Sequence, residues 1–193
     1  MNIFYLHNDP RTCAEMHLDK HVVKMILEYA QLLSTAHRVI NGTVVVGLSK
    51  TGRKQTRYVL PDHLDSILYS ATHINHPSAQ WVRKSHANYI WLADLLNELC
   101  AEYTYRYGKV HKVESDGLLR ALLIYHPHGI GFAPFTEPTP AMPDDCKVPG
   151  DSITSYRNYY INNKTHIASW SGKIASRNPP AWYTGISQGE YNV

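Results

Sequence analysis

The chain has 193 residues, with 19 Lys and Arg against 16 Asp and Glu and a formal net charge of +3. The length predicts one domain over residues 1–193 that can bury a core without disulfide or metal staples, and the small charge excludes a polyelectrolyte. No apolar run reaches the roughly 18 residues of a membrane span, and the first residues lack the basic and apolar parts of a secretory signal.

The cysteines and the aromatic side chains narrow the class of protein further. The 3 Cys lie far apart with no Cys-x-x-Cys pair, which disfavours a disulfide framework or a zinc ribbon and fits a reducing cytoplasm. The chain also holds 14 Tyr, 4 Trp and 12 His but only 3 Phe. Most of its rings therefore carry a polar group, which suits stacking and hydrogen bonding as well as core packing.

The N-terminal third predicts a long first helix and a small hairpin. Residues 3–6 are apolar, and a helical pattern then runs over residues 12–40 and ends at Gly42. Residues 43–46 and 56–60 are rich in β-branched side chains and predict the two strands of a β-hairpin. This region contains four cations and no acidic residue between them, namely Lys50, Arg53, Lys54 and Arg57.

The rest of the chain predicts more helices and two irregular stretches. The helices are expected at residues 62–73, 77–107, 115–125 and 152–164. Residues 127–150 contain six of the 11 Pro and predict an extended segment, because no helix survives that density. Residues 167–193 predict an irregular tail. The predicted fold class is mainly α, a compact single-domain helical protein with a central first helix, a small β-hairpin and a long irregular C-terminal tail.

The first helix carries the strongest functional signal. At 100° per residue, one polar side of residues 12–40 collects His17, His21, Lys24 and Glu28, opposite a wide apolar arc. Three interpretations stay open. The polar side is a solvated face, or it is an active-site floor on which these four residues are catalytic, or His17 and His21 bind a metal. Because no His-Glu-x-x-His motif supports a metal, we expect neither a metal nor another cofactor.

A second set of side chains has the aromatic and basic character of a nucleic-acid surface. The candidate substrate-binding residues are His73, His76, Trp81, Arg83, Lys84, Arg106, Tyr159, Trp170, Arg177, Trp182 and Tyr183. Each has a structural alternative: helix capping for the two histidines, core packing for the aromatic residues, and compensation of the helix dipole for a cation at a helix end. Charge favours a polyanion as partner, because residues 1–60 and 147–193 carry +4 and +3.

Two motifs resemble a known family. Cys13-Ala-Glu-Met-His17-Leu18 looks like the start of the central helix of the pyrimidine-dimer DNA glycosylases of the phage endonuclease V type. Ser176-Arg177-Asn-Pro179-Pro-Ala-Trp182-Tyr183 looks like the C-terminal signature of that family. The chain is also similar to uncharacterised proteins of tailed phages, in His17-x-Asp-Lys-His21-Val-Val-Lys24 and Thr72-His-Ile-Asn-His-Pro77. The resemblance implies a compact all-α fold, a phage source, DNA as the partner and repair as the function.

The resemblance also implies a mechanism. In that family an N-terminal amine attacks the deoxyribose and a glutamate on the central helix assists. This chain begins Met-Asn, and the register of the family's glutamate falls on Lys24, with Glu28 one turn later. An imine mechanism would therefore use the amine of Met1 or Lys24, with Glu28 as the acid that guides ring opening.

The leading hypothesis from the sequence is a phage DNA-processing or repair enzyme. It would resemble a DNA glycosylase and abasic-site lyase, act on a modified or damaged base in duplex DNA, and work in the host cytoplasm. The first alternative is a nucleotide or cyclic-nucleotide hydrolase that uses His17 and His21, and the second is a non-catalytic binder of nucleic acid or nucleotides. No membrane partner is expected, and the oligomeric state stays open. The expected phosphate contacts are Lys50, Arg53, Lys54, Arg83 and Lys84.

Overall fold

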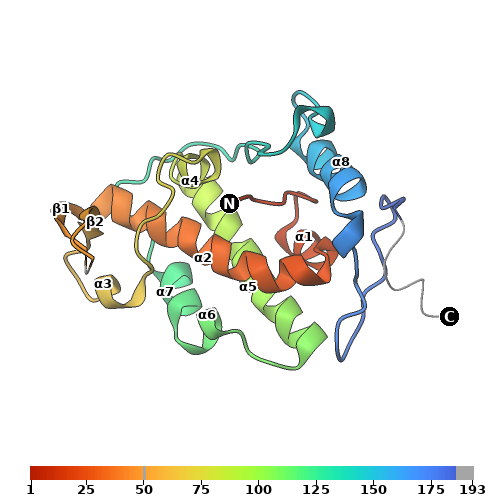
Figure 1. Cartoon of the computed structure of the whole chain (residues 1–193), viewed down its shortest axis with the longest axis horizontal. Helices are drawn as coiled ribbons and strands as arrows, with labels where there is room; N and C mark the ends of the chain where they lie inside the picture. Colours follow the sequence, from red (N-terminus) through yellow and green to blue (C-terminus); the bar gives the residue numbers. More distant parts are fainter. Residues whose placement is uncertain (50, 186–193) are drawn as a thin grey trace.

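Two long helices cross at the centre of the structure, α2 (Asp19–Asn41) and α5 (His86–Tyr107), and the other elements pack around them (Figure 1). The computed structural model describes residues 1–49 and 51–185. The described chain is mainly α-helical with one two-stranded sheet, which confirms the predicted fold class at that level. No helix among these residues combines the length and the apolar character that a membrane crossing needs.

Shorter helices surround this central pair. They are α1 (Pro10–Met16), α3 (Leu64–Ile67), α4 (Pro77–Val82), α6 (Lys112–Ser115), α7 (Leu118–Ile124) and α8 (Ser152–Asn163), with 3-10 turns at Asp144–Cys146 and Thr165–Ile167. Helices α1 and α4 pack against α5, whereas α4, α6 and α7 contact α2. The central helix of the fold is therefore α2, which is the second helix in chain order and not the first.

The N-terminal residues belong to the core. Apolar side chains recur every three to four positions along α2, and Met25, Ile26 and Tyr29 among them are at most 1% exposed. Residues 3–6 are buried as well. The backbone N–H of Phe4 donates to Tyr29 Oη at 3.0 Å. This packing holds the start of the chain against one side of α2.

The single helix predicted over residues 12–40 is wrong, because the chain bends between α1 and α2. His17 and Leu18 have extended backbone angles, with ψ of 134° and 156°. The buried guanidinium of Arg106 stabilises the bend. Its Nη atoms donate to the backbone carbonyls of Glu15 and His17, both at 2.9 Å. Carbonyl groups that a continuous helix would have paired internally are satisfied here by a side chain from α5.

Arg106 also connects this bend to the tail. Its Nε donates to Glu102 at 2.7 Å and its Nη1 to Asp19 at 2.9 Å. The Glu102 carboxylate accepts from Arg177 in the tail, and the Asp19 carboxylate accepts from Ser169 at 2.6 Å. Burial by itself would raise the pKa of Glu102, but the hydrogen bonds with Arg177 and Arg106 lower it. One buried cation thus joins α1, α2, α5 and the tail.

A second buried arginine explains why the helix predicted at residues 62–73 is only the single turn α3. The Arg38 guanidinium donates to the carbonyls of Asp65, Leu68 and Tyr69 at 2.6 to 2.9 Å. Because these oxygens already accept from Arg38, the chain leaves the helix and runs extended past α2. The competing partner comes from another helix, so the local pattern could not reveal it.

The other helix predictions differ at internal breaks. The helix expected over residues 77–107 is divided at Ser85, whose hydroxyl caps the start of α5. The helix expected over residues 115–125 is divided at Gly117, which has a φ of 81° and separates α6 from α7. The last predicted helix is present as α8, with Asp151 as its N-cap.

The predicted β-hairpin is confirmed and projects from one end of the molecule (Figure 1). Strand β1 (Thr43–Leu48) pairs antiparallel with β2 (Lys54–Val59), with Thr43 opposite Val59 and Leu48 opposite Lys54. Lys50, one of the expected phosphate contacts, lies outside the described residues.

Two long segments without helix or strand lie over the helices. Residues 127–143 pass α4 on the way to α8 (Figure 1), and Trp81 Nε1 donates to the carbonyl of Thr136 at 2.8 Å. Residues 168–185 of the tail return to the bend between α1 and α2, where Trp170 Nε1 donates to the carbonyl of Met16 at 3.0 Å. The rest of the predicted tail, residues 186–193, lies outside the described residues.

We expect Arg106→Met to lower the free energy of unfolding by about 3–5 kcal/mol, because the Asp19 carboxylate loses its cation, the buried Glu102 keeps only Arg177, and the carbonyls of Glu15 and His17 lose their donor. Urea denaturation followed by circular dichroism measures this loss. The matched control is Arg120→Met on the exposed side of α7, which should change stability by less than about 0.5 kcal/mol. A loss below about 1 kcal/mol for Arg106→Met would contradict this role of the Arg106 side chain.

Candidate active site

His17 does not lie with the other three predicted catalytic residues. It sits in the bend between α1 and α2 and is fully buried. Its Nδ1 lies 2.7 Å from the carbonyl oxygen of Cys13 and its Nε2 lies 3.2 Å from Tyr29 Oη, so both ring nitrogens are engaged inside the protein. Burial lowers the pKa of His17 to about 4, despite the opposing hydrogen bond with Cys13. His17 therefore acts as a neutral packing residue.

The remaining three, His21, Lys24 and Glu28, line one hollow of about 340 Å³ beside α2. The N-terminal residues form one wall, and the start of α4 and the end of α8 contribute to the others. The residues around the hollow are Met1, Asn2, Phe4, His21, Lys24, Met25, Glu28, His76, Ala141, Tyr159 and Lys164. We call this the N-terminal hollow. It brings together titratable groups from three distant parts of the chain.

The Glu28 carboxylate contacts both the N-terminal segment and the amine of Lys24. Its Oε2 accepts from the backbone N–H of Asn2 at 3.3 Å, and its Oε1 lies 3.3 Å from Lys24 Nζ. The Glu28 side chain is 16% exposed, whereas that of Lys24 is 69% exposed. A mostly buried carboxylate thus faces a solvent-accessible amine across the hollow, an arrangement suited to proton transfer.

His21 is held as a neutral imidazole on the same side of α2. Its ring stacks on Phe4 with centroids 4.1 Å apart, and its Nδ1 lies 2.7 Å from Tyr160 Oη. Burial, together with the nearby His17, Lys164 and Lys24, lowers the pKa of His21 well below its ordinary value. Burial also raises the pKa of Tyr160 well above its ordinary value, so the phenol keeps its proton. The hydrogen bond between two neutral groups fixes the orientation of the His21 ring.

His76 and Tyr159, both predicted to bind substrate, also border the N-terminal hollow. His76 caps α4 through its Nδ1, which accepts from the N–H of Ser78. Burial lowers the pKa of His76, and the α-amino group of Met1 lowers it further. His73 is exposed on the preceding turn and contributes to the same shift. Lys24, Lys164 and the α-amino group of Met1 thus surround the single carboxylate of Glu28 in this hollow, and His76 adds a neutral imidazole.

A second hollow of about 570 Å³ adjoins the first along α4 and the 127–143 segment. Arg83 and Lys84 line it together with Glu137, and Lys84 is exposed, so their predicted role in binding stays a prediction. Trp81 borders the same hollow but is 4% exposed, with its Nε1 bonded to the carbonyl of Thr136. The Trp81 ring therefore packs in the core and is not a surface for stacking a base.

The predicted stacking surface of the tail is instead a packing cluster. Trp170 is 2% exposed and Tyr183 packs on it with ring centroids 4.9 Å apart. Trp182 is half-buried, with the Arg157 guanidinium 5.3 Å from its ring centroid. These rings close over the bend between α1 and α2, so their aromatic faces contact the protein.

Arg106 and Arg177 are likewise engaged inside the protein. Arg106 is fully buried in the cluster that joins α1, α2 and the tail. Arg177 pairs with Glu102 at 2.9 Å and with Glu15 at 3.4 Å, and its guanidinium lies 4.3 Å from the ring centroid of Tyr105. Because Arg106 has no exposed surface, the prediction that it binds substrate is wrong, whereas Arg177 keeps 30% of its side chain exposed and its substrate contact stays a prediction.

The sequence interpretation missed the participation of Asn2 and Lys164. Three hydrogen bonds hold Asn2 at the hollow. Its backbone N–H donates to Glu28, its side-chain Nδ2 donates to the carbonyl of Ala141, and its Oδ1 accepts from the hydroxyl of Tyr156. The apolar run at residues 3–6 was the available signal, because a buried N-terminal segment fixes the residue before it. Lys164 lies with its Nζ 4.5 Å from the centroid of the Tyr159 ring. Nothing in the local pattern distinguished Lys164 from a lysine at any helix end.

Comparisons with protein-family models, with curated proteins and with solved structures found no match to this chain. The resemblance to the endonuclease V type of glycosylase therefore stays a prediction. Within residues 1–49 and 51–185, no group of three or more His, Cys, Asp and Glu side chains has the geometry to hold a metal ion.

We expect the free energy of unfolding to decrease as the pH falls from about 6.5 towards 4. Burial lowers the pKa of both His17 and His37 to about 4 in the folded chain, against about 6.5 when unfolded. The unfolded chain therefore binds more protons in this window, and each histidine lowers stability by up to about 1.4 kcal/mol per pH unit. Stability should be constant above this window and should lose its dependence on these groups below it.

Urea denaturation at pH 7, 6 and 5 measures this slope. His17→Gln is expected to be less stable at pH 7 and to show a shallower slope. The exposed His63 provides the control, because His63→Gln removes a histidine outside the core and should retain the slope of the unmodified chain. Equal slopes for all three proteins would contradict the assignment of neutral, buried His17.

Proposed function

We propose that this protein is a DNA-processing enzyme of the glycosylase and abasic-site lyase kind, acting on a damaged or modified base in duplex DNA. The observation that carries the proposal is the N-terminal hollow, where the Glu28 carboxylate lies 3.3 Å from the backbone nitrogen of Asn2 and 3.3 Å from Lys24 Nζ. A carboxylate paired with a nearby amine is the minimum set of groups for imine chemistry on a sugar.

The reaction would proceed through a covalent bond to the deoxyribose. A neutral amine attacks C1′, the bond from C1′ to the base breaks, and the base leaves with the electron pair and takes up a proton. The alkylated amine passes a proton to the Glu28 carboxylate, Glu28 delivers this proton to the ring oxygen, and the ring opens to a protonated imine. The Glu28 carboxylate then removes a proton from C2′, and the 3′ phosphate leaves by β-elimination. Water releases the sugar and restores the amine.

Surrounding groups support a polyanionic substrate. Lys24 and Lys164 border the hollow, and Arg83 and Lys84 line the second one together with the single carboxylate of Glu137. Phosphates on either side of an extruded nucleotide would meet these cations, whereas the neutral His21 would contact the sugar or base through its Nε2. The volume of about 340 Å³ is of the size that one nucleotide needs.

The reaction can be trapped directly. We expect borohydride to link the protein covalently to a duplex that carries an abasic site, and Glu28→Gln to reduce strand cleavage at least 100-fold. The matched control is Glu114→Gln, an exposed position on α6, which should cleave as the unmodified protein does. Absence of both adduct and cleavage, on abasic and on ultraviolet-irradiated duplexes, would refute the proposal.

The same experiment identifies the amine. If Lys24 is the nucleophile, Lys24→Arg abolishes trapping, because a guanidinium keeps the charge but does not form the imine. Lys20→Arg, one turn earlier on α2, is the control and should trap normally. If the α-amino group is the nucleophile, Lys24→Arg still traps, and mass spectrometry places the reduced adduct on the peptide that contains Met1.

A further inference from the structure

The hairpin of β1 and β2 has exposed faces that nothing in the described chain covers. All six residues of β1 are exposed, and in β2 only Tyr58 is half-buried. The apolar side chains of Val44, Val46 and Leu48 are 55%, 57% and 72% exposed. A two-stranded hairpin is marginally stable in water. Because these three apolar side chains stay in solvent, their burial does not contribute to the stability of the hairpin. These features indicate a surface that is completed by a partner.

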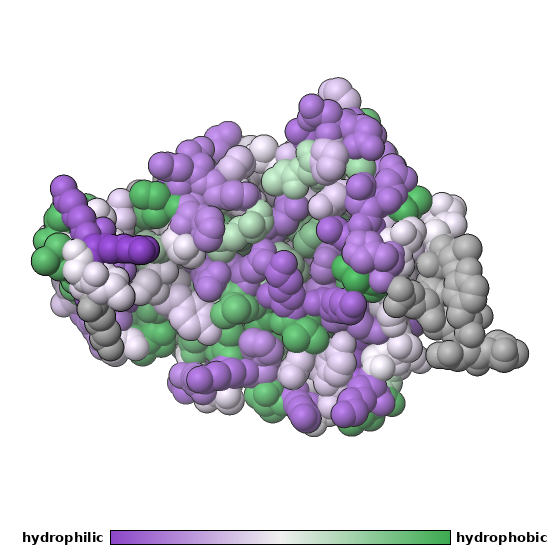
Figure 2. Space-filling view, viewed as in Figure 1, coloured by the Kyte–Doolittle hydropathy of each residue, from purple (hydrophilic) through white to green (hydrophobic). Residues whose placement is uncertain are grey.

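The register places apolar and basic side chains together on this hairpin. Val46 pairs with Thr56 and Leu48 with Lys54, so these four residues share one face. Arg57 pairs with Val45 on the other face. Figure 2 shows hydrophobic and strongly hydrophilic residues side by side at this end of the molecule.

The charge of the hairpin is entirely positive. Arg53, Lys54 and Arg57 are exposed, and residues 43–60 contain no acidic residue. Among the ion pairs between described residues, none includes any of these three side chains. Their charges are left for a partner, which must then be an anion.

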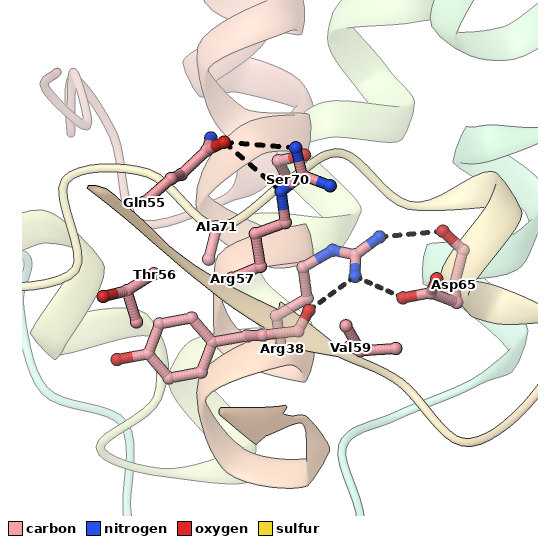
Figure 3. Close-up of a pocket in the computed structure, with 9 residues that line it drawn as sticks. Arg38, Gln55, Thr56, Arg57, Val59, Asp65, Ser70 and Ala71 are labelled. Carbon is pink, nitrogen blue, oxygen red and sulfur yellow. Dashed lines mark hydrogen bonds and ion pairs between the residues drawn. The ribbon is translucent and has the colours of Figure 1, made fainter. Parts of the chain in front are cut away.

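A buried arginine fixes the base of the hairpin. Arg38 Nη1 donates to the carbonyl of Tyr58 at 2.8 Å and to Asp65 Oδ1 at 2.6 Å, and Asp65 Oδ1 also accepts from the N–H of Leu60 (Figure 3). With its bonds to Tyr69 and the Asp65 and Leu68 carbonyls, Arg38 uses all five of its donors within the protein. The hairpin therefore leaves the helical body in a set direction.

Two more cations follow α4, which lies between the hairpin and the N-terminus (Figure 1). Arg83 and Lys84 line the hollow that adjoins the N-terminal hollow along α4. A strand of DNA held by the hairpin would thus pass the candidate catalytic groups.

We propose that the hairpin is a DNA-binding arm that enters the major groove of duplex DNA, an inference that rests on the proposed function for the identity of the polyanion. Six residues per strand give the arm a length of about 20 Å. The major groove is about 12 Å wide and admits a two-stranded ribbon. Its phosphates would pair with Arg53, Lys54 and Arg57, and its thymine methyl groups would cover the exposed Val46 and Leu48.

A second copy of the chain fits this surface less well than DNA does. Pairing of two such hairpins would bring Arg53, Lys54 and Arg57 of one copy close to the same cations of the other. Like charges placed on neighbouring strands destabilise a sheet, and no carboxylate in residues 43–60 offsets them. Charge complementarity therefore favours the nucleic acid.

The test compares two variants that each lose three positive charges. Arg53→Gln with Lys54→Gln and Arg57→Gln alters the arm, and Lys109→Gln with Lys112→Gln and Arg120→Gln alters exposed cations near α6 and α7. Binding of an undamaged 20-base-pair duplex is measured by fluorescence anisotropy at several salt concentrations. Each lost phosphate contact reduces the slope of log K against log salt by about 0.9. We expect the magnitude of this slope to be smaller by about 2 to 3 for the arm variant, and its affinity to be at least tenfold lower. The control variant should keep the slope and the affinity of the unmodified protein.

An arm variant that binds as tightly as the control, with the same slope, would overturn the proposal. Should the triple variant fail to fold by circular dichroism, the single substitutions Lys54→Gln and Arg53→Gln replace it, each with an expected slope change of about 0.9.

Groove and partner are tested separately. Dimethyl sulfate methylates guanine N7 in the major groove, so the protein should protect guanines close to a single abasic-site analogue, and the arm variant should not. Protection confined to adenine N3 in the minor groove would overturn the groove assignment.

Pairing of two copies is tested by sedimentation velocity. If the protein forms a dimer that Val46→Asp dissociates while the affinity for DNA stays unchanged, the proposal is also overturned.

Failure of the arm and failure of the proposed reaction are distinguishable. Duplex binding that depends on the arm, with no borohydride adduct, supports the arm and refutes the imine reaction. Adduct formation with wild-type duplex affinity in the arm variant refutes the arm and supports the reaction.

Discussion

The buried guanidinium of Arg106 is the interaction on which the arrangement of this protein depends. It replaces the internal pairing of one continuous helix with hydrogen bonds to the carbonyls of Glu15 and His17, and it binds the carboxylates of Glu102 and Asp19. An ionised group with no exposed surface is stable only when its charge is balanced and all its donors are used. The bend between α1 and α2, the position of α5 and the path of the tail therefore form a single constraint.

The N-terminal hollow follows from that constraint. Because the chain bends at His17, α1 turns away from α2 and residues 3–6 can enter the core beside Tyr29. Asn2 is thereby held against Glu28. The bend also moves His17 out of line with His21, so that one histidine stays in the core and the other faces the hollow. The bend thus removes His17 from the predicted catalytic set, and it lets the first residues of the chain form one wall of the N-terminal hollow.

Two buried arginines divide the structure into a rigid body and a projecting element. Arg106 ties the tail to the helices at one end, where the aromatic side chains of Trp170 and Tyr183 are used for packing. Arg38 sets the hairpin at the other end, where cations and apolar side chains remain exposed. Aromatic residues accompanied by cations were expected to mark the nucleic-acid surface. In this protein most of those rings cover the bend, and the hairpin carries three exposed cations that belong to none of the ion pairs between described residues.

The sequence by itself determined the mainly helical class, the hairpin, α8 with its Asp151 cap, and the spacing of His21, Lys24 and Glu28 along one helix. These features depend on local periodicity, capping and turn chemistry, which residues close in the chain decide. Only the tertiary structure decided the bend at His17 and the early end of α3, because Arg106 and Arg38 reach backbone carbonyls far away in the sequence. It also decided which candidates share a site, since Asn2, His76 and Lys164 meet Glu28 through packing that no local pattern encodes.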